Sequence, residues 1–299
     1  MTAPDTIDVA LVRALLEEQF PAWAHLPIEP VAVSGWDNRT FHLGAELCVR
    51  LPSHAVYASA IDKEHTWLPR LGPHLPLPVP HSVALGHASS LFPWSFSVRR
   101  WLPGEAAERT ASLDGLVLAR DLAAFLVALR SVPVEDAPLA GAHSFERGSH
   151  PRCYGGQVEA ALDTGAPDID RRAVATLWEA AMATEWDAAP VWLHGDVAAG
   201  NLLMHHGRLA AVIDFGTCAV GDPACDLVIA WTFLEGGERE VFRSSLGLND
   251  DTWLRGQAWA LWKALILHTG LARSNAREMA AAPRVLSALG VLRNEKARP

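Results

Sequence analysis

The stretch VWLHGDVAAGNLLMHHGRLAAVIDFGTCAVG, residues 191–221, decides how the rest of the chain is interpreted. It opens with the apolar run Val191–Leu193, which is typical of a short buried strand and leads into Asp196. Two further apolar segments, separated by the letters HHGR, predict a β-hairpin. The pattern therefore places Asp196 at the end of a strand, Asn201 at the start of the hairpin and Asp214 directly after it.

Two carboxylates and one amide in this order suit phosphoryl transfer. An acceptor hydroxyl needs a carboxylate beside it, and Mg²⁺ next to nucleotide phosphates prefers oxygen ligands. The spacing Asp-x-x-x-x-Asn followed by Asp-Phe-Gly matches the two signatures of protein kinases, with His-Gly-Asp in place of His-Arg-Asp. The alternative is a hairpin in which Asp and Asn serve only as turn residues.

The segments HGDVAAGN, IDFG and GDPACDL resemble the aminoglycoside phosphotransferase family, whose members are small-molecule kinases related to protein kinases. The resemblance covers most of the chain. Carried over by position, it implies that Asp196 is the catalytic base and that Asn201 and Asp214 are the metal ligands. It also implies that His194 supports the loop and that Asp226 braces it.

The composition of the whole chain limits the classes of function. With 299 residues, half of them hydrophobic, the chain can bury the core of one large domain or two ordinary ones. A net charge of −9 argues against a nucleic-acid partner and fits a cationic small substrate. Neither a signal-like N-terminus nor a stretch of 18 apolar residues occurs, so we expect a cytoplasmic protein without a membrane partner. The four cysteines lack Cys-x-x-Cys spacing and are expected to be reduced thiols.

Before this stretch, the pattern predicts a five-stranded antiparallel sheet with one long helix. The expected strands are residues 28–33, 39–43, 46–51, 83–85 and 95–101, with a helix over residues 56–71. A Pro-Gly pair ends the pattern and marks a hinge at about 99–104. We therefore expect an α+β, protein-kinase-like fold of two lobes. Residues 1–103 would form the nucleotide-binding lobe, and residues 104–299 a mainly helical lobe with the catalytic loop and the acceptor site.

The third expected strand carries Arg50 where protein kinases place a phosphate-binding Lys. The lysines of this chain, Lys63, Lys263 and Lys296, all lie elsewhere. A guanidinium can bridge phosphate oxygens and stays charged, so Arg50 can serve the same purpose with a different reach. Glu64 on the following helix is its expected ion-pair partner, because the kinase scaffold requires a carboxylate there. A solvent-facing Glu is the alternative.

Three further nucleotide contacts are predicted by position alone. Ser34 lies in the turn where a kinase folds a loop over the phosphates, although ordinary turn chemistry explains this residue equally well. Arg100 and Leu102 lie at the hinge, where the resemblance implies that backbone N–H and C=O groups receive the adenine edge.

Two groups of residues leave alternatives open. A set of tryptophans either walls a substrate cleft beside Glu235 and Glu238 or packs in the core, and core packing is the default for Trp at helical spacing. This set is Trp231, Trp253, Trp259 and Trp262. Residues 141–165 show few regular apolar positions and are expected to form a loop-rich insertion near the acceptor.

The sequence thus predicts an ATP-dependent O-phosphotransferase, with GTP as an alternative donor and Mg²⁺ as cofactor. The expected acceptor is a hydroxyl of a small molecule, an aminoglycoside or a similar antibiotic. Three alternatives stay open: a pseudo-kinase that binds nucleotide without transfer, a kinase of a metabolite alcohol such as a choline-like amine, and a metal-dependent phosphohydrolase.

Overall fold

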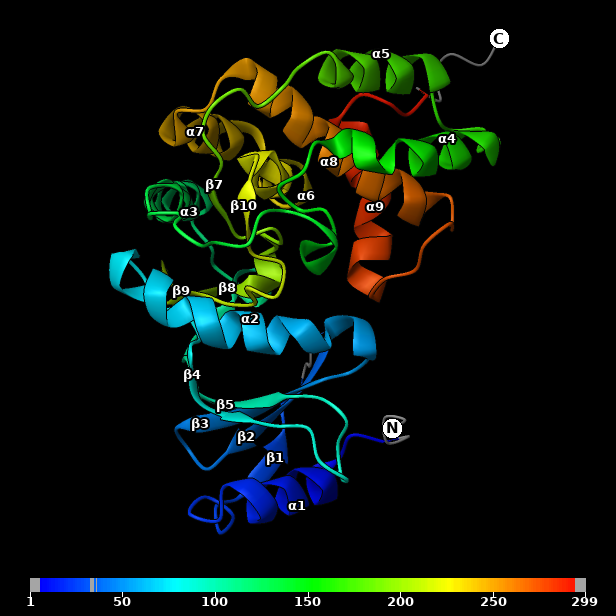
Figure 1. The fold of residues 1–299 in the computed structure, drawn as a ribbon. Coiled ribbons are helices and arrows are strands. Elements are labelled where there is room, and N and C mark those ends of the chain that lie inside the picture. The colour runs from blue at the N-terminus through cyan, green and yellow to red at the C-terminus, as the bar shows by residue number, and fades with distance from the viewer. Residues whose placement is uncertain (1–5, 33–34, 36, 294–299) are drawn as a thin grey trace. The chain divides into compact units, whose positions relative to one another are not determined.

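The chain forms two compact units in the computed structural model, which describes residues 6–32, 35 and 37–293 (Figure 1). The first unit contains the N-terminal part up to Gly104 and residues 210–216. The second unit contains residues 105–209 and the chain from Thr217 onward. The chain therefore leaves the first unit after Gly104, returns to it for seven residues that include the Asp-Phe-Gly segment, and then leaves it again.

The first unit is built on an antiparallel sheet whose strand order is β1-β2-β3-β5-β4. The strands are β1 (Ile28–Pro30), β2 (Asn38–Leu43), β3 (Leu47–Pro52), β4 (Ser82–Gly86) and β5 (Phe96–Arg100). Helix α1 (Val9–Gln19) precedes the sheet, and helix α2 (Ala55–Leu71) follows β3. The five-stranded sheet with one long helix, predicted from the sequence, is confirmed.

Strand β3 is buried along almost its whole length, and this explains where its arginine points. Val49 and Leu51 belong to the hydrophobic core that also contains buried residues of α1. Because successive side chains of a strand alternate between the two faces, Arg50 points to the opposite face. Glu64 of α2 contacts Arg50 there, which places a cation and a carboxylate in the interior of this unit.

The second unit is mainly helical. Its helices are α3 (Gly115–Arg130), α4 (Gly155–Asp163), α5 (Arg171–Met182), α6 (Ile229–Thr232), α7 (Gly236–Leu246), α8 (Asp250–His268) and α9 (Ala276–Ala288). Most residues of α8 are buried, so this helix forms the centre of the unit. Two short strands, β7 (Val191–Leu193) and β10 (Ala219–Gly221), pair antiparallel.

The predicted hairpin is present. Strand β8 (Leu202–His205) lies between β6 (Glu105–Ala106) and β9 (Arg208–Val212) in a small sheet. The chain passes back into the first unit within β9. Asp214 follows this strand after one residue, as the sequence pattern predicts.

Two local features could not be read from the sequence pattern. Asp114 caps α3, because its carboxylate accepts hydrogen bonds from the backbone N–H groups of Leu116 and Val117. Residues 141–165 contain helix α4 in addition to turns. Neighbouring residues of cap-forming type look alike in the sequence, and only the backbone conformation selects which of them reaches the free N–H groups.

The tryptophan set packs in the core, since all four side chains are at most 6% exposed. Glu235 and Glu238 form the capping box of α7, and Glu235 also pairs with Arg284. These acidic groups therefore have structural partners, and the tryptophans pack as the core alternative predicts.

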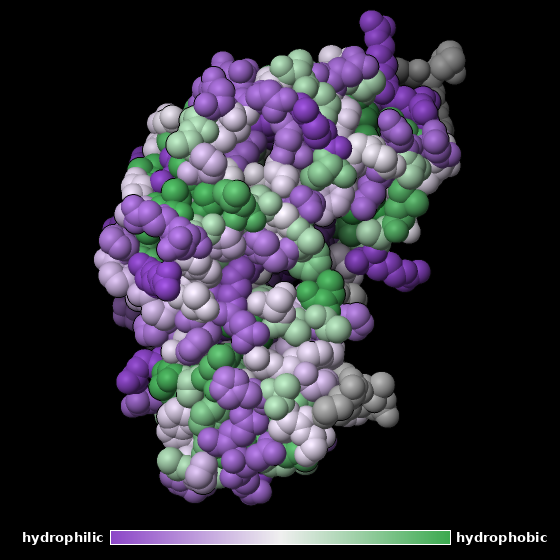
Figure 2. Space-filling view, in the orientation of Figure 1, coloured by the Kyte–Doolittle hydropathy of each residue, from purple (hydrophilic) through white to green (hydrophobic). Residues whose placement is uncertain are grey.

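The face drawn in Figure 2 shows hydrophilic and hydrophobic side chains interspersed over both units. Across the described residues, no helix combines the length and the apolar character that a membrane crossing requires.

A buried ion pair stabilises the second unit, and its loss is testable. Arg255 on α8 is fully buried and donates to Asp222 at 2.6 Å and to the hydroxyl of Thr184 at 3.0 Å. We expect Arg255→Met to lower the free energy of unfolding by about 3–5 kcal/mol, because Asp222 would stay buried without its partner. Arg152→Met, which removes an exposed pair with Glu185, should cost less than about 1 kcal/mol. Urea denaturation compares the two, and equal losses would contradict the assignment.

Candidate active site

The interior of the first unit holds a carboxylate between two guanidinium groups. Glu64 is 1% exposed, and its Oε1 accepts from Arg50 Nη1 at 3.3 Å. Its other oxygen, Oε2, accepts from Arg99 Nη2 at 2.7 Å. Burial alone raises the pKa of Glu64, but the charges of Arg99 and Arg50 outweigh it and lower the pKa to about 2. The predicted partnership of Arg50 and Glu64 is present, and Arg99 is a second partner that the sequence analysis missed.

The same carboxylate fastens the Asp-Phe-Gly segment to this unit. The backbone N–H of Phe215 donates to Glu64 Oε1 at 3.0 Å, and the Phe215 side chain is fully buried. Asp214 adopts a φ of 67°, a left-handed conformation that is uncommon outside glycine. Arg50 Nη2 lies 2.5 Å from Asp214 Oδ1. The strained backbone thus presents the Asp214 carboxylate to the cation of β3.

A third carboxylate of the first unit also lies near this cation. Asp37 Oδ2 is 3.7 Å from Arg50 Nη2. Burial and the negative charge of Asp214 raise the pKa of Asp37 to about 6. The sequence analysis assigned no role to this residue, and its position directly before β2 was the one available signal.

Three other nucleotide contacts were predicted: Ser34, Arg100 and Leu102. Ser34 lies outside the described residues. Arg100 is exposed, with Nη1 3.7 Å from Glu46 Oε2, and Leu102 is half-buried in the segment after β5. The roles assigned to these three residues stay predictions.

In the second unit, a buried aspartate anchors the loop that follows β7. Asp226 lies in the 3₁₀ helix Pro223–Val228 and accepts from the backbone N–H groups of His194 at 2.9 Å and Gly195 at 2.7 Å. His194 Nδ1 in turn accepts from the backbone N–H of Asp196 at 3.2 Å. Gly195 has a φ of 85°, and a Cβ there would lie 2.7 Å from the carbonyl oxygen of Thr217. The backbone before Asp196 is therefore held at every residue.

The loop exposes one carboxylate while its neighbours are buried. Asp196 is exposed, between the buried residues Gly195 and Val197. Asn201 Nδ2 donates to the backbone oxygen of Asp196 at 3.0 Å and to its carboxylate Oδ2 at 3.3 Å. The structure thus brings Asp196 and Asn201 together in the second unit, as it brings Arg50, Glu64 and Asp214 together in the first.

Arg147, which the sequence analysis missed, also holds this loop. Arg147 Nε donates to the carbonyl oxygen of Gly195 at 3.2 Å. Its guanidinium carbon lies 4.9 Å from the ring centroid of Trp259 and 5.0 Å from that of Trp262, a cation–π geometry. Arg147 lies in the segment without apolar periodicity, and its partners are aromatic faces and a backbone carbonyl. No sequence pattern records such partners.

The two predicted metal ligands lie in different units, Asp214 in the first and Asn201 in the second. Both side chains carry an oxygen donor of the kind that Mg²⁺ prefers, and both are only partly buried. Their role as metal ligands stays a prediction.

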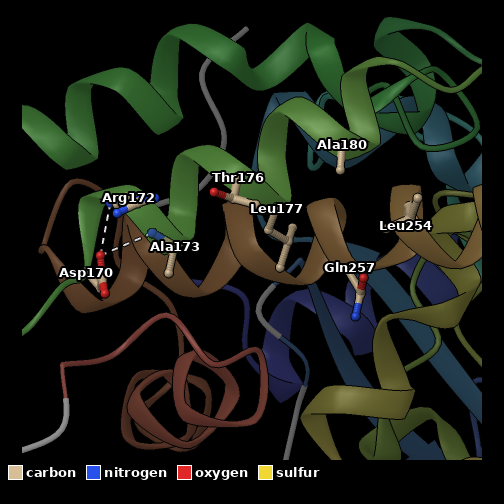
Figure 3. A pocket seen from close by; sticks show the side chains of 8 residues that line it. All are labelled: Asp170, Arg172, Ala173, Thr176, Leu177, Ala180, Leu254 and Gln257. Carbon is tan, nitrogen blue, oxygen red and sulfur yellow. Dashed lines mark hydrogen bonds between the residues drawn. The ribbon is translucent and has the colours of Figure 1, made fainter.

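A groove of about 490 Å³ lies elsewhere on the second unit, between α5 and α8 (Figure 3). It is lined by Asp170, Arg172, Ala173, Thr176, Leu177, Ala180, Leu254 and Gln257. Asp170 caps α5 by accepting from the backbone N–H groups of Arg172 and Ala173. None of the predicted site residues lines this groove.

The sequence matches a family model, and the fold matches solved structures. The sequence model of the phosphotransferase enzyme family, APH, matches residues 28–265. No curated protein matches the chain in sequence.

Similar solved structures include the GDP complex of wild-type aminoglycoside 2'-phosphotransferase-IIIa, with a TM-score of 0.77 and 18% identity over 95% of this chain and 98% of that one. The macrolide 2'-phosphotransferase apoenzyme from Brachybacterium faecium has a TM-score of 0.61 and 23% identity over 93% and 97% of the two chains. The streptomycin–ATP ternary complex of APH(2")-IIa has a TM-score of 0.60 and 16% identity over 95% and 97%.

These matches, with an antiparallel sheet followed by a helical part, define a protein-kinase-like fold. Because the family model spans residues 28–265, the chain belongs to the phosphotransferase enzyme family.

The ionisation of Glu64 should make its contribution to stability depend on pH. Its folded-state pKa of about 2 lies below the ordinary value of 4.5, so the contribution is complete above about pH 4.5 and is lost as the pH falls toward 2. We expect Glu64→Gln to destabilise the protein by a few kcal/mol at pH 7, and the deficit to shrink between pH 5 and pH 3. Chemical denaturation of both proteins across this range measures the deficit. Asp62→Asn, at an exposed position of the same helix, should show no such trend.

The contacts of Arg147 predict a role in positioning the loop. We expect Arg147→Met to lower kcat about 10-fold or more with little change in the KM for nucleotide, because Gly195 would lose its hydrogen-bond donor while Met still covers the tryptophan faces. Arg147→Lys should recover part of the activity. Steady-state kinetics with purified variants decides, and a kcat equal to that of the wild type would contradict the assignment.

Proposed function

We propose that this protein transfers the γ-phosphate of ATP or GTP to a hydroxyl group of a small molecule, and that this acceptor is an antibiotic. The observation that carries the proposal is the exposed Asp196 carboxylate, bound by Asn201 on a loop anchored by Asp226. The similar solved structures support the choice of substrates, since they include a GDP complex, a complex with streptomycin and ATP, and a macrolide 2'-phosphotransferase. We place the reaction in the cytoplasm, where both nucleotides are available.

In this proposal, Asp196 binds the acceptor hydroxyl, orients its oxygen toward the γ-phosphorus and accepts its proton as the new oxygen–phosphorus bond forms. The bond from the γ-phosphorus to the bridging oxygen breaks, and the nucleoside diphosphate leaves. A rigid loop suits this task because phosphoryl transfer depends mainly on positioning and on neutralising charge.

The first unit would hold the nucleotide. Arg50, kept in place by Glu64, would contact the phosphate oxygens, and its planar guanidinium suits that contact. Ser34 would contact the phosphates, and the backbone at Arg100 and Leu102 the base. Asn201 and Asp214 would hold Mg²⁺, which when bound neutralises charge on the phosphates.

A pseudo-kinase is the second candidate, because Arg50 replaces the Lys of protein kinases. The ion pair of Arg50 with Glu64 and the bound pair of Asp196 and Asn201 favour transfer instead. A kinase of a choline-like metabolite alcohol would use the same groups, and a phosphohydrolase would release free phosphate without any acceptor.

The role of Asp196 gives the direct test of transfer. With Mg-ATP or Mg-GTP and a panel of hydroxyl compounds, we expect a phosphorylated product that mass spectrometry detects. Asp196→Asn should lower its rate about 10²–10⁴-fold, because the amide cannot accept the hydroxyl proton. Asp187→Asn, at an exposed position before β7, should leave the rate unchanged.

Nucleotide binding, measured by calorimetry, separates the alternatives. Asp196→Asn should bind the nucleotide as the wild type does, because the proposed nucleotide contacts lie mainly in the first unit. Binding without product in the wild type would support the pseudo-kinase, and phosphate release that is independent of acceptor would support the phosphohydrolase.

A further inference from the structure

Acidic side chains of the second unit lie beside the catalytic loop, where a cationic acceptor would need them. The carboxylate of Glu108 is close to Gly200, since a Cβ at that glycine would lie 3.5 Å from it. Glu278, in the first turn of α9, lies within electrostatic reach of Arg147, which binds the loop at Gly195. An amino sugar with several ammonium groups is recognised through carboxylates in such positions.

Both carboxylates already have a cationic partner from the chain itself. Arg277 forms an ion pair with Glu108. Lys263 Nζ lies 3.1 Å from Glu278 Oε2, which also accepts from the hydroxyl of Ser274. An ammonium group of an acceptor would therefore have to displace a side chain before it gained an ion pair.

Two further charged residues near the loop, Arg147 and Glu146, do not favour a polycation either. The guanidinium of Arg147, fixed over two indole rings, repels ammonium groups. The neighbouring carboxylate of Glu146 accepts a hydrogen bond from Ser149 at 3.0 Å. The net charge of −9 for the whole chain thus does not describe the surroundings of Asp196.

We infer that the acceptor is a hydroxyl compound that is neutral or carries a single positive charge, and that polycationic amino sugars are poor acceptors. This inference rests on the proposed function, because it concerns the compound that Asp196 activates. The expectation of a cationic acceptor used only the overall charge of the chain. The present inference uses the ion pairs that the carboxylates beside the loop form.

Calorimetry on the full chain with bound Mg-ADP or Mg-GDP tests the inference. The probes are kanamycin and gentamicin, which carry several ammonium groups, and a set of macrolides with one amine or none. We expect the best macrolide to bind at least about 10-fold more tightly than kanamycin, with little dependence on salt. Tighter binding of kanamycin than of every macrolide, or no binding of any macrolide, would overturn the inference.

Charge variants test the cause. The double variant Lys263→Gln/Arg277→Gln frees Glu278 and Glu108, and we expect its affinity for kanamycin to rise about 10-fold while that for the macrolide stays within about 3-fold. The matched control Arg152→Gln/Arg243→Gln removes the same number of charges from exposed ion pairs with Glu185 and Asp250. An equal gain in the control would show an effect of net charge alone and would overturn the inference.

Product analysis distinguishes failure of the inference from failure of the proposed function. If the macrolide binds more tightly but neither compound is phosphorylated with Mg-ATP or Mg-GTP, the proposed function fails and the inferred preference for low charge stands. If kanamycin is phosphorylated with a higher kcat/KM than every macrolide, the proposed function stands and the inference fails.

Discussion

The first unit depends on one buried carboxylate that is neutralised from two strands. Glu64 lies between the guanidinium groups of Arg50 and Arg99, and it also accepts the backbone N–H of Phe215. A buried charge is tolerated only when it is paired and hydrogen-bonded, so these donors must be in place for the unit to fold. The same contacts hold the guanidinium of Arg50 beside Asp214. The arrangement that neutralises Glu64 is therefore the one that the proposed nucleotide binding would use.

In the second unit, two side chains bind the backbone of the loop that carries Asp196. Asp226 is buried and satisfies two backbone N–H groups of the loop, and Arg147 satisfies the carbonyl of Gly195. Because these hydrogen bonds fix the backbone of the loop, the Asp196 side chain can be exposed to solvent while its position stays defined. Catalysis by positioning requires an accessible reactive group on a rigid support.

The sequence predicted those charged groups that follow from strand alternation or that match the kinase pattern. The pairing of Arg50 with Glu64 and the order of strands and helix around it were accessible, because both follow from alternation and from the kinase pattern. Arg99, Asp37 and Arg147 were not. Each acts through a partner that is distant in the sequence or that is a backbone or aromatic group, and such partners leave no mark on periodicity.

By itself, therefore, the sequence determined the family and the kinase-like fold and suggested which residues are proposed to carry the chemistry, since these depend on local motifs and on patterns of hydrophobicity. Apart from the pair of Arg50 and Glu64, only the tertiary structure decided which charges neutralise one another. Glu108 and Glu278 appear as plain acidic residues in the sequence, and in the folded chain Arg277 and Lys263 pair with them. Coulomb interactions act through space, so the charge that an acceptor meets is set by the contacts of the folded chain and not by its composition.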